Sequence, residues 1–166
     1  MRVEQVDVAA LYAAHRVQLV RMAVLLVDDL GSAEDVVQDA FIGLHRHRDS
    51  IREPQAALGY LRRAVVNGSR STLRKRGTVR RHPSLVEVGS SDPPDTDLLL
   101  DEEHREVLAA VRSLPPGQRQ VVVLRYWSNL SEAEIAEAVG ISRGAVKSQA
   151  SRGMDKIEKI LAGDRR

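Results

Sequence analysis

The chain has 166 residues, of which 43% are hydrophobic, enough to build the core of one domain or of two small ones. It contains no cysteine, which excludes disulfides, thiolate metal sites and a cysteine nucleophile. The net charge of +2 says little about partners, and the sequence shows neither an apolar run of membrane-spanning length nor a signal-peptide pattern. We therefore expect a cytoplasmic protein without membrane insertion.

The first predicted helix covers residues 8 to about 27. Its apolar side chains recur at steps of three and four residues, which places them on one helical face. His15 lies on that face, and we interpret it as a core or boundary residue because no cluster of metal ligands accompanies it. Neither a metal site nor a cofactor is predicted.

A second helix is predicted up to about Arg48, with Ser32 as its N-cap and Asp35 three residues further on. The apolar spacing predicts a buried stripe of Ala33, Val36, Val37, Ala40, Phe41 and Leu44. Acidic and amide side chains fall on a different face: Glu34, Asp35, Gln38 and Asp39. Such a face is either simply solvated or meets a basic partner.

The third helical stretch starts at Pro54 and is expected to end near Arg76. Gly68 and the serines and threonine near it weaken the helix, so a break is predicted around residues 67–69. No acid occurs in residues 54–86, but many cations do: Arg62, Arg63, Arg70, Arg74, Lys75, Arg76, Arg80 and Arg81. This basic block is either a surface for a polyanion or a solvated helix face with a basic tail.

Prolines and serines mark residues 77–99 as a flexible linker, and acids accumulate from residue 87 to residue 103. We therefore predict two domains, residues 1–76 and residues 100–166. The second domain starts with a helix that stops at Pro115, followed by a helix over residues 117–127.

A helix-turn-helix is predicted after residue 130. Ser131 and Glu134 form a capping box, Gly140 fits the left-handed position after the helix, and Ser142 fits the N-cap of a last helix over residues 143 to about 161. Small and apolar residues suit the close crossing of the two helices: Ile135, Ala136, Val139, Ile141 and Val146. The fold class is thus all-α, with two small bundles joined by a linker and the helix-turn-helix in the second.

The last helix carries side chains that suit base edges and phosphates: Arg143, Lys147, Ser148, Gln149 and Arg152. The alternative interpretation is a helical hairpin of an ordinary bundle, whose basic residues are only solvated. The motif alone does not separate a repressor from other DNA-binding proteins.

Three stretches in order resemble the extracytoplasmic-function (ECF) sigma factors of bacterial RNA polymerase. Residues 33–41 (Ala-Glu-Asp-Val-Val-Gln-Asp-Ala-Phe) are similar to the helix of that family that binds core polymerase. Residues 60–67 and 73–76 are similar to its segment for the −10 promoter element, and residues 114–126, 131–136 and 146–148 to its −35 element domain. The resemblance implies a dissociable subunit that directs promoter recognition, DNA opening and initiation.

The resemblance also implies the site residues. Core polymerase, through the clamp helices of β′ and through β, would meet Asp35, Gln38, Asp39 and Phe41. The −10 element would meet Tyr60, Arg62, Arg63, Asn67, Arg70, Ser71, Arg74 and Arg76, with residues 67–71 at a loop that takes bases out of the stack. The −35 element would meet Arg119, Ser142, Arg143, Lys147, Ser148, Gln149 and Arg152. An anti-sigma factor is a further implied partner.

The chain departs from the family pattern at several of these positions. Ala145 stands where threonine is frequent, and Gln149 stands where arginine is frequent, which changes the chemistry offered to the −35 element. Tyr60 and Ser71 stand where tryptophan and aspartate are frequent.

The alternatives to a sigma factor are a stand-alone helix-turn-helix regulator and an enzyme. A stand-alone helix-turn-helix regulator would bind a symmetric duplex without polymerase. An enzyme is not supported, since the sequence offers no convergent set of nucleophile, base and orienting group, and no glycine loop for phosphate. No catalytic residue is therefore predicted.

Overall fold

A computed structural model describes residues 5–81 and 102–164 of the chain. Within these residues every regular element is a helix, as the sequence predicts. Residues 5–81 belong to one compact unit and residues 102–164 to another. Each unit has its own apolar core, so each is described by itself.

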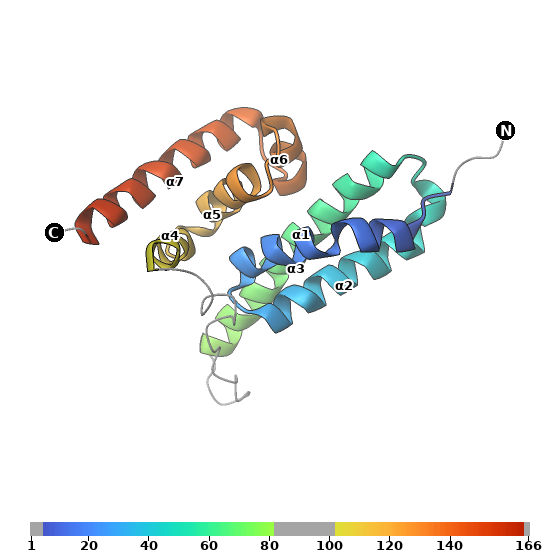
Figure 1. The fold of residues 1–166 in the computed structure, drawn as a ribbon, viewed down its shortest axis with the longest axis horizontal. Helices are drawn as coiled ribbons and strands as arrows, with labels where there is room; N and C mark the ends of the chain where they lie inside the picture. The colour runs from blue at the N-terminus through green and yellow to red at the C-terminus, as the bar shows by residue number, and fades with distance from the viewer. Residues whose placement is uncertain (1–4, 82–101, 165–166) are drawn as a thin grey trace. The chain divides into compact units, whose positions relative to one another are not determined.

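The first unit is built from three helices that pack side by side (Figure 1). They are α1 (Val8–Val27), α2 (Leu30–His47) and α3 (Pro54–Arg81), with a short 3-10 turn, η1 (Arg48–Ser50), after α2. The predicted stripe of α2 is buried in full. It meets fully buried side chains of the other two helices, among them Leu26, Leu61 and Val65.

The helix α1 has the length and the mean hydropathy, 1.3, of a segment that crosses a membrane. A helix in the core of a soluble protein has the same length and hydropathy. The second half of α1 belongs to the core of the first unit, since Leu19 and the residues from Met22 to Val27 are buried there. Their burial against α2 and α3 accounts for the apolar composition of the second half of α1.

The helix α2 does not begin as the sequence predicts. Asp28 has a left-handed backbone, with φ of 73°, and ends α1. Asp29 follows in an extended conformation and is the N-cap of α2, where its carboxylate accepts a hydrogen bond from the backbone N–H of Ser32 at 2.8 Å. The prediction of Ser32 as the cap is therefore wrong, because Ser32 already lies in the first turn.

The predicted break in α3 is also wrong, because α3 is one continuous helix. A Cβ atom on Gly68 would lie 3.0 Å from Cγ1 of Val36, so the glycine lets α3 approach α2 closely. This packing outweighs the low helix propensity of the segment. Residues 77–81 continue α3 instead of starting the linker. The remainder of the predicted linker, residues 82–99, lies outside the described residues.

The second unit places α7 (Arg143–Asp164) against three shorter helices (Figure 1). These are α4 (Glu102–Arg112), α5 (Pro116–Val122) and α6 (Glu132–Val139). A π-helical turn, η3 (Val123–Trp127), follows α5, so the helix predicted over residues 117–127 has two parts. The core consists of fully buried aliphatic side chains: Val111, Val121, Val122, Val123, Leu124, Ile135 and Val146.

The helix-turn-helix forms as predicted, from α6 and α7. The backbone N–H of Glu134 donates to the Ser131 hydroxyl at 3.2 Å, and the Glu134 carboxylate accepts from the Ser131 N–H at 2.7 Å. Gly140 has φ of 77°, a left-handed conformation that ends α6. The Ser142 hydroxyl then caps α7 by accepting from the N–H of Ala145 at 3.1 Å. Local capping chemistry thus sets the sharp turn that presents the first turns of α7.

Candidate functional site

The predicted polymerase-binding residues lie on both sides of α2. Asp35, Gln38 and Asp39 are exposed and spaced three and four residues apart, so they share one face. Phe41 is buried, and its ring meets Tyr12 of α1 edge-on at 5.0 Å between centroids. The structure therefore groups the three polar residues at the surface and uses Phe41 to hold α2 against α1.

The sequence prediction omitted Ile42 from this face. Ile42 follows Gln38 by four residues and Asp39 by three, and it is 44% exposed. An exposed isoleucine beside two acidic side chains gives the face an apolar centre of the kind that protein interfaces use. The signal was present in the sequence, because the same periodicity that defines the acidic face also includes position 42. We refer to Asp35, Gln38, Asp39 and Ile42 as the α2 face.

The basic side chains of α3 fall into a stripe along that helix. Arg63, Asn67, Arg70 and Arg74 follow one another at steps of four, three and four residues, which keeps them on one face. The structure leaves all four at least partly accessible. Because α3 is unbroken, these residues form a continuous line, and the loop that was expected at residues 67–71 does not occur. We refer to these four residues as the α3 stripe.

Tyr60 lies near the beginning of α3, beside a surface hollow. The hollow has a volume of about 360 Å³ and is lined by Ser50, Ile51, Arg52, Glu53, Ala56, Tyr60 and Arg63. The Tyr60 hydroxyl is 3.5 Å from Nδ1 of His47, and the two rings are 5.8 Å apart between centroids. The irregular backbone next to Tyr60 is thus the segment after α2, residues 48–53, and not the region around Asn67.

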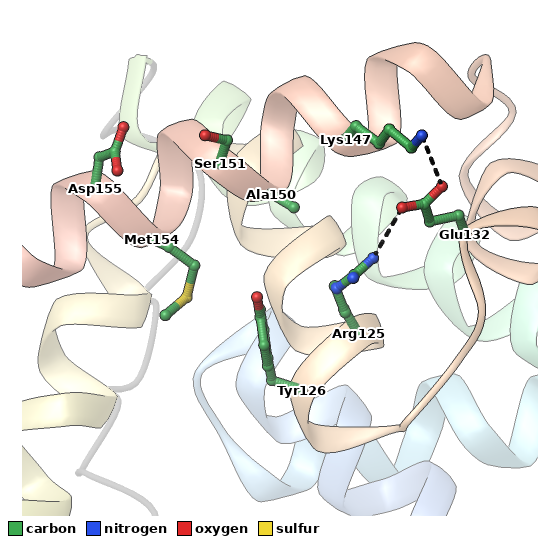
Figure 2. Close-up of a pocket in the computed structure, with 8 residues that line it drawn as sticks. All are labelled: Arg125, Tyr126, Glu132, Lys147, Ala150, Ser151, Met154 and Asp155. Atoms are coloured by element: carbon green, nitrogen blue, oxygen red, sulfur yellow. Dashed lines mark hydrogen bonds and ion pairs between the residues drawn. The ribbon is translucent and has the colours of Figure 1, made fainter.

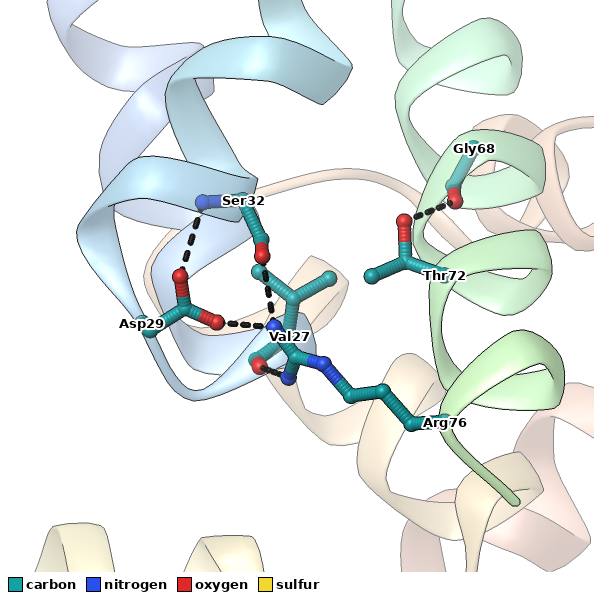
Figure 3. A network of polar contacts seen from close by, with 6 residues as sticks. All are labelled: Val27, Asp29, Ser32, Gly68, Thr72 and Arg76. Atoms are coloured by element: carbon teal, nitrogen blue, oxygen red, sulfur yellow. Dashed lines mark hydrogen bonds and ion pairs between the residues drawn. The ribbon is translucent and has the colours of Figure 1, made fainter. Parts of the chain in front are cut away.

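Arg76 does not join the α3 stripe. Its guanidinium turns back toward the start of α2, where it donates to the Val27 carbonyl, to the Ser32 hydroxyl and to the Asp29 carboxylate (Figure 3). The side chains of Arg76 and Asp29 are 26% and 23% exposed, so this pair is shielded from most of the solvent. Arg76 therefore ties α3 to the junction of α1 and α2.

This network changes the titration of Asp29. Partial burial raises the pKa of the Asp29 carboxyl, but three hydrogen bonds and the charge of Arg76 lower it more. The hydrogen bonds come from the Ser32 N–H, the Arg76 guanidinium and the Ser32 hydroxyl. The net result is a pKa below the ordinary value for aspartate, so the carboxylate stays ionised at neutral pH.

In the second unit, three of the predicted −35 residues share the open face of α7. Lys147, Ser148 and Arg152 are exposed there, while Arg143 and Ser142 lie exposed at the beginning of the helix. Two others lie away from that face. Gln149 is partly buried, with its amide close to Gly117 at the start of α5, and Arg119 is only 6% exposed. The structure thus brings together five of the seven predicted residues.

A charged cluster joins the two helices of the helix-turn-helix (Figure 2). The Glu132 carboxylate at the start of α6 lies 3.3 Å from Nη1 of Arg125 and 3.9 Å from Nζ of Lys147. The cluster borders a hollow of about 270 Å³, which Tyr126, Ala150, Ser151, Met154 and Asp155 also line. The sequence prediction missed Arg125 and Glu132. Only the fold brings η3 and the beginning of α6 next to Lys147.

The described parts of the chain, residues 5–81 and 102–164, contain no group of three or more His, Asp or Glu side chains arranged to hold a metal ion. What they do contain is one partly acidic helix face, one basic helix stripe and one helix-turn-helix with cations on its second helix. Phosphate groups and base edges are the natural ligands of the second and third surfaces.

Comparisons with known proteins match both units. The family model of sigma-70 region 2 matches residues 11–79, and the model of sigma-70 region 4 matches residues 104–157. The RNA polymerase sigma-E factor of Streptomyces avermitilis is 33% identical over 147 residues, which cover 86% of this chain and 78% of that protein. The ECF RNA polymerase sigma factor SigM of Mycobacterium tuberculosis is 30% identical over 151 residues, covering 91% of this chain and 75% of that protein.

Solved structures show a similar fold. The sigma factor RpoE of Bartonella quintana, in complex with the anti-sigma factor NepR, is 22% identical with a TM-score of 0.74, covering 93% of this chain and 96% of that one. CnrH, in complex with the cytosolic domain of CnrY, is 24% identical with a TM-score of 0.70, covering 95% of this chain and 88% of that one.

Proposed function

The chain belongs to the ECF sigma factors of bacterial RNA polymerase, and from this premise we propose that its α2 face binds core polymerase while the α3 stripe and α7 bind promoter DNA. A sigma factor binds core RNA polymerase and directs it to promoters, so promoter recognition and transcription initiation are the function of this chain. The observation that carries this conclusion is the presence of both sigma-70 regions, in order, in one chain.

We propose that core polymerase binds the α2 face through charge and one apolar contact. Asp35 and Asp39 are exposed acids, and Ile42 is an exposed apolar side chain one turn further along the same face. Such a face suits a basic helical surface, the chemistry that the family resemblance assigns to the β′ clamp helices. Charge complementarity sets the register and the encounter rate, and burial of Ile42 adds affinity.

For the −10 element we propose that the phosphates follow the α3 stripe and that an unstacked base enters the hollow beside Tyr60. A volume of about 360 Å³, an aromatic ring and the cation of Arg63 are the features that favour a flipped base and its phosphate. Arg76 is left out of this surface because it is engaged with Asp29 and Ser32. Ser71 and Arg62 remain candidates at the borders of the stripe.

For the −35 element we propose that α7 enters the major groove of the duplex. Lys147, Ser148 and Arg152 lie on its open face and offer donors to phosphates and base edges. Arg125 is added to this surface because it lies in the same charged cluster as Lys147. Gln149 and Arg119 support the surface from beneath, by their packing around α5.

The remaining expectations are consistent with this role. Sigma factors are initiation factors without enzymatic activity, and we propose the same of this chain. We also propose that it acts in the cytoplasm, where the polymerase and the DNA are. An anti-sigma factor is a proposed partner, since one similar sigma factor was solved with such a protein bound. The stand-alone regulator is not favoured, because it gives no reason for a sigma-70 region 2.

The proposal is tested by reconstitution. The purified chain is mixed with bacterial core RNA polymerase and a library of promoter fragments, and transcripts are sequenced. Transcripts with defined starts should depend on the chain. If the chain neither binds core polymerase nor directs initiation, while it binds a palindromic duplex alone, the stand-alone regulator replaces the proposal.

The α2 face is tested by reversing one charge. Asp39→Arg should weaken binding to core polymerase by about tenfold or more, because it places a cation opposite a basic surface. The matched control is Asp49→Arg, which makes the same change on a 78% exposed side chain outside α2. Affinities are measured by titrating labelled chain with core polymerase. Equal losses in the two variants would remove Asp39 from the interface.

A further inference from the structure

Glu132 is an acidic side chain placed within the surface proposed for the −35 element. It is the first residue of α6, and its carboxylate lies between Arg125 of η3 and Lys147 of α7 (Figure 2). A negative charge at this place is unexpected on a surface that is to approach phosphates, because phosphates repel it.

The local structure holds Glu132 in place. An acid in the first turn of a helix is stabilised by the helix dipole, and Arg125 adds a nearby positive charge at 3.3 Å. Glu132 is only 21% exposed, and Arg125 is 38% exposed. The carboxylate is thus packed between its neighbours and has little freedom to turn away when DNA arrives.

Lys147 is held much less firmly. Its ammonium group is 3.9 Å from the carboxylate, and its side chain is 70% exposed, so it is free to turn toward an incoming phosphate. Turning would exchange the carboxylate of Glu132 for a phosphate oxygen. Two cations and one carboxylate also leave the cluster with a single net positive charge. Asp155, which lines the same hollow, lowers the local potential further.

We propose that Glu132 weakens the binding of duplex phosphates by competing for Lys147 and Arg125. This inference rests on the proposed binding of the −35 element by α7 and adds to it a residue that sets affinity. Phosphate contacts carry no sequence information, while base contacts do. By lowering the sequence-independent part of the affinity, Glu132 leaves recognition more dependent on the base contacts of α7.

The test is the variant Glu132→Gln in the full chain. Glutamine keeps the size of the side chain and removes the charge. The probe is a 20-base-pair duplex of random sequence, titrated by fluorescence anisotropy over a series of NaCl concentrations. We expect binding to tighten by about three- to tenfold at low salt, and the slope of log K against log salt to steepen by about 1.

The matched control is Glu158→Gln. It makes the same change of total charge on an exposed side chain of α7, 11 residues beyond Lys147. That spacing corresponds to about 16 Å along the helix, roughly two screening lengths at physiological salt. The control should change the affinity by less than Glu132→Gln does at each salt concentration, and by less than about twofold at 0.15 M salt. Loss of the helix-end charge lowers stability if it changes it at all, and unfolding would weaken binding by the folded α7 instead of tightening it.

A second variant tests the competition itself. In a Lys147→Ala background the gain from Glu132→Gln should shrink, because one of the two competed cations is gone. Unchanged or weaker binding by Glu132→Gln would overturn the proposal, since it would mean that the carboxylate is neutral or orients the cations for DNA. An undiminished gain in the Lys147→Ala background would overturn the competition.

Failure of the underlying function gives a different result. If the unmodified chain binds no duplex and Lys147→Ala changes nothing, α7 does not bind DNA, and the proposed −35 role fails together with this inference. If the unmodified chain binds DNA through Lys147 and Glu132→Gln does not tighten that binding, only the role of Glu132 fails.

Discussion

The α3 stripe and the open face of α7, with Lys147, Ser148 and Arg152, both carry cations, but they differ in the acids around them. The helix α3 contains no acidic residue along its whole length, and Asp29, which meets Arg76 of α3, comes from the start of α2. On α7, by contrast, Lys147 faces Glu132, and Asp155 follows on the same helix. The two helices therefore differ in the acids that they carry themselves.

This difference corresponds to two kinds of recognition. A line of cations on a helix without acids of its own attracts the backbone of any strand, and it suits a step in which the strands separate and single bases are held. A helix whose cations are partly offset by acids gains more of its affinity from base edges in the major groove. We infer that the first unit supplies more of the salt-dependent affinity and the second unit more of the selectivity.

The largest expected effect comes from breaking the α3 stripe at two points. In Arg63→Ala/Arg74→Ala, cations near both ends of the stripe are lost. We expect the assembled holoenzyme to bind its promoter about 30- to 100-fold more weakly, with a shallower dependence on salt. Binding is measured by anisotropy with a labelled promoter fragment at several NaCl concentrations.

The control for the stripe is Lys75→Ala. Lys75 is exposed on the same helix, but it lies one residue, or about 100°, around from Arg74. It should cost less than about threefold, as expected for a charge that faces away from the DNA. If Lys75→Ala weakens binding as much as the loss of one stripe arginine, binding depends on the total positive charge of α3 and the α3 stripe has no special role.

Sequence patterns predicted most of the fold because its determinants are local. The stripe of α2, the capping box at Ser131 and Glu134, and the left-handed Gly140 each depend on residues a few positions apart. The same holds for Asp35, Gln38 and Asp39, whose shared face follows from helical periodicity alone.

Apart from the N-cap of α2, the predictions fail where contacts between distant segments decide the structure. By its helix propensity, Gly68 predicts a break in α3. The structure shows instead that Gly68 packs against Val36, which lies 32 positions earlier in the sequence. The sequence groups Arg76 with the other cations of α3. In the structure Arg76 donates a hydrogen bond to Asp29, which lies 47 positions earlier. Glu132 and Lys147 meet only because the turn at Gly140 folds α7 back along α6. Neither helix propensities nor counts of charged residues contain information about such contacts between distant residues.

A smaller effect is expected from Asp29→Asn, which tests why Arg76 is absent from the α3 stripe. Asparagine still caps α2, but the ion pair with Arg76 is lost. We expect the free energy of unfolding to fall by about 1 kcal/mol at pH 7, since the pair is mostly shielded from solvent. Urea unfolding followed by circular dichroism measures the difference.

The effect of Asp29→Asn should depend on pH in a defined direction. The folded pKa of Asp29 is lowered, so the stabilisation by the carboxylate is fully present above the unfolded pKa near 4 and is lost as pH falls through the folded pKa. The difference between the two proteins should therefore shrink below about pH 4. A difference that is the same at pH 7 and pH 3 would mean that the charge of Asp29 contributes nothing.

The smallest effect concerns the continuity of the stripe, which requires α3 to pass close to α2 without a break. Gly59→Ala and Gly68→Ala make the same change in one helix, but only Gly68 faces a neighbour. Gly59 has open space around its Cβ position, so alanine should stabilise the protein by about 0.5–1 kcal/mol through helix propensity. At Gly68 the new methyl group would meet Val36 at 3.0 Å and offset that gain. Thermal unfolding should therefore rank Gly59→Ala above both Gly68→Ala and the unmodified chain. Equal gains in the two variants would show that α2 gives way easily, and that close packing at Gly68 is not what keeps α3 straight beneath the α3 stripe.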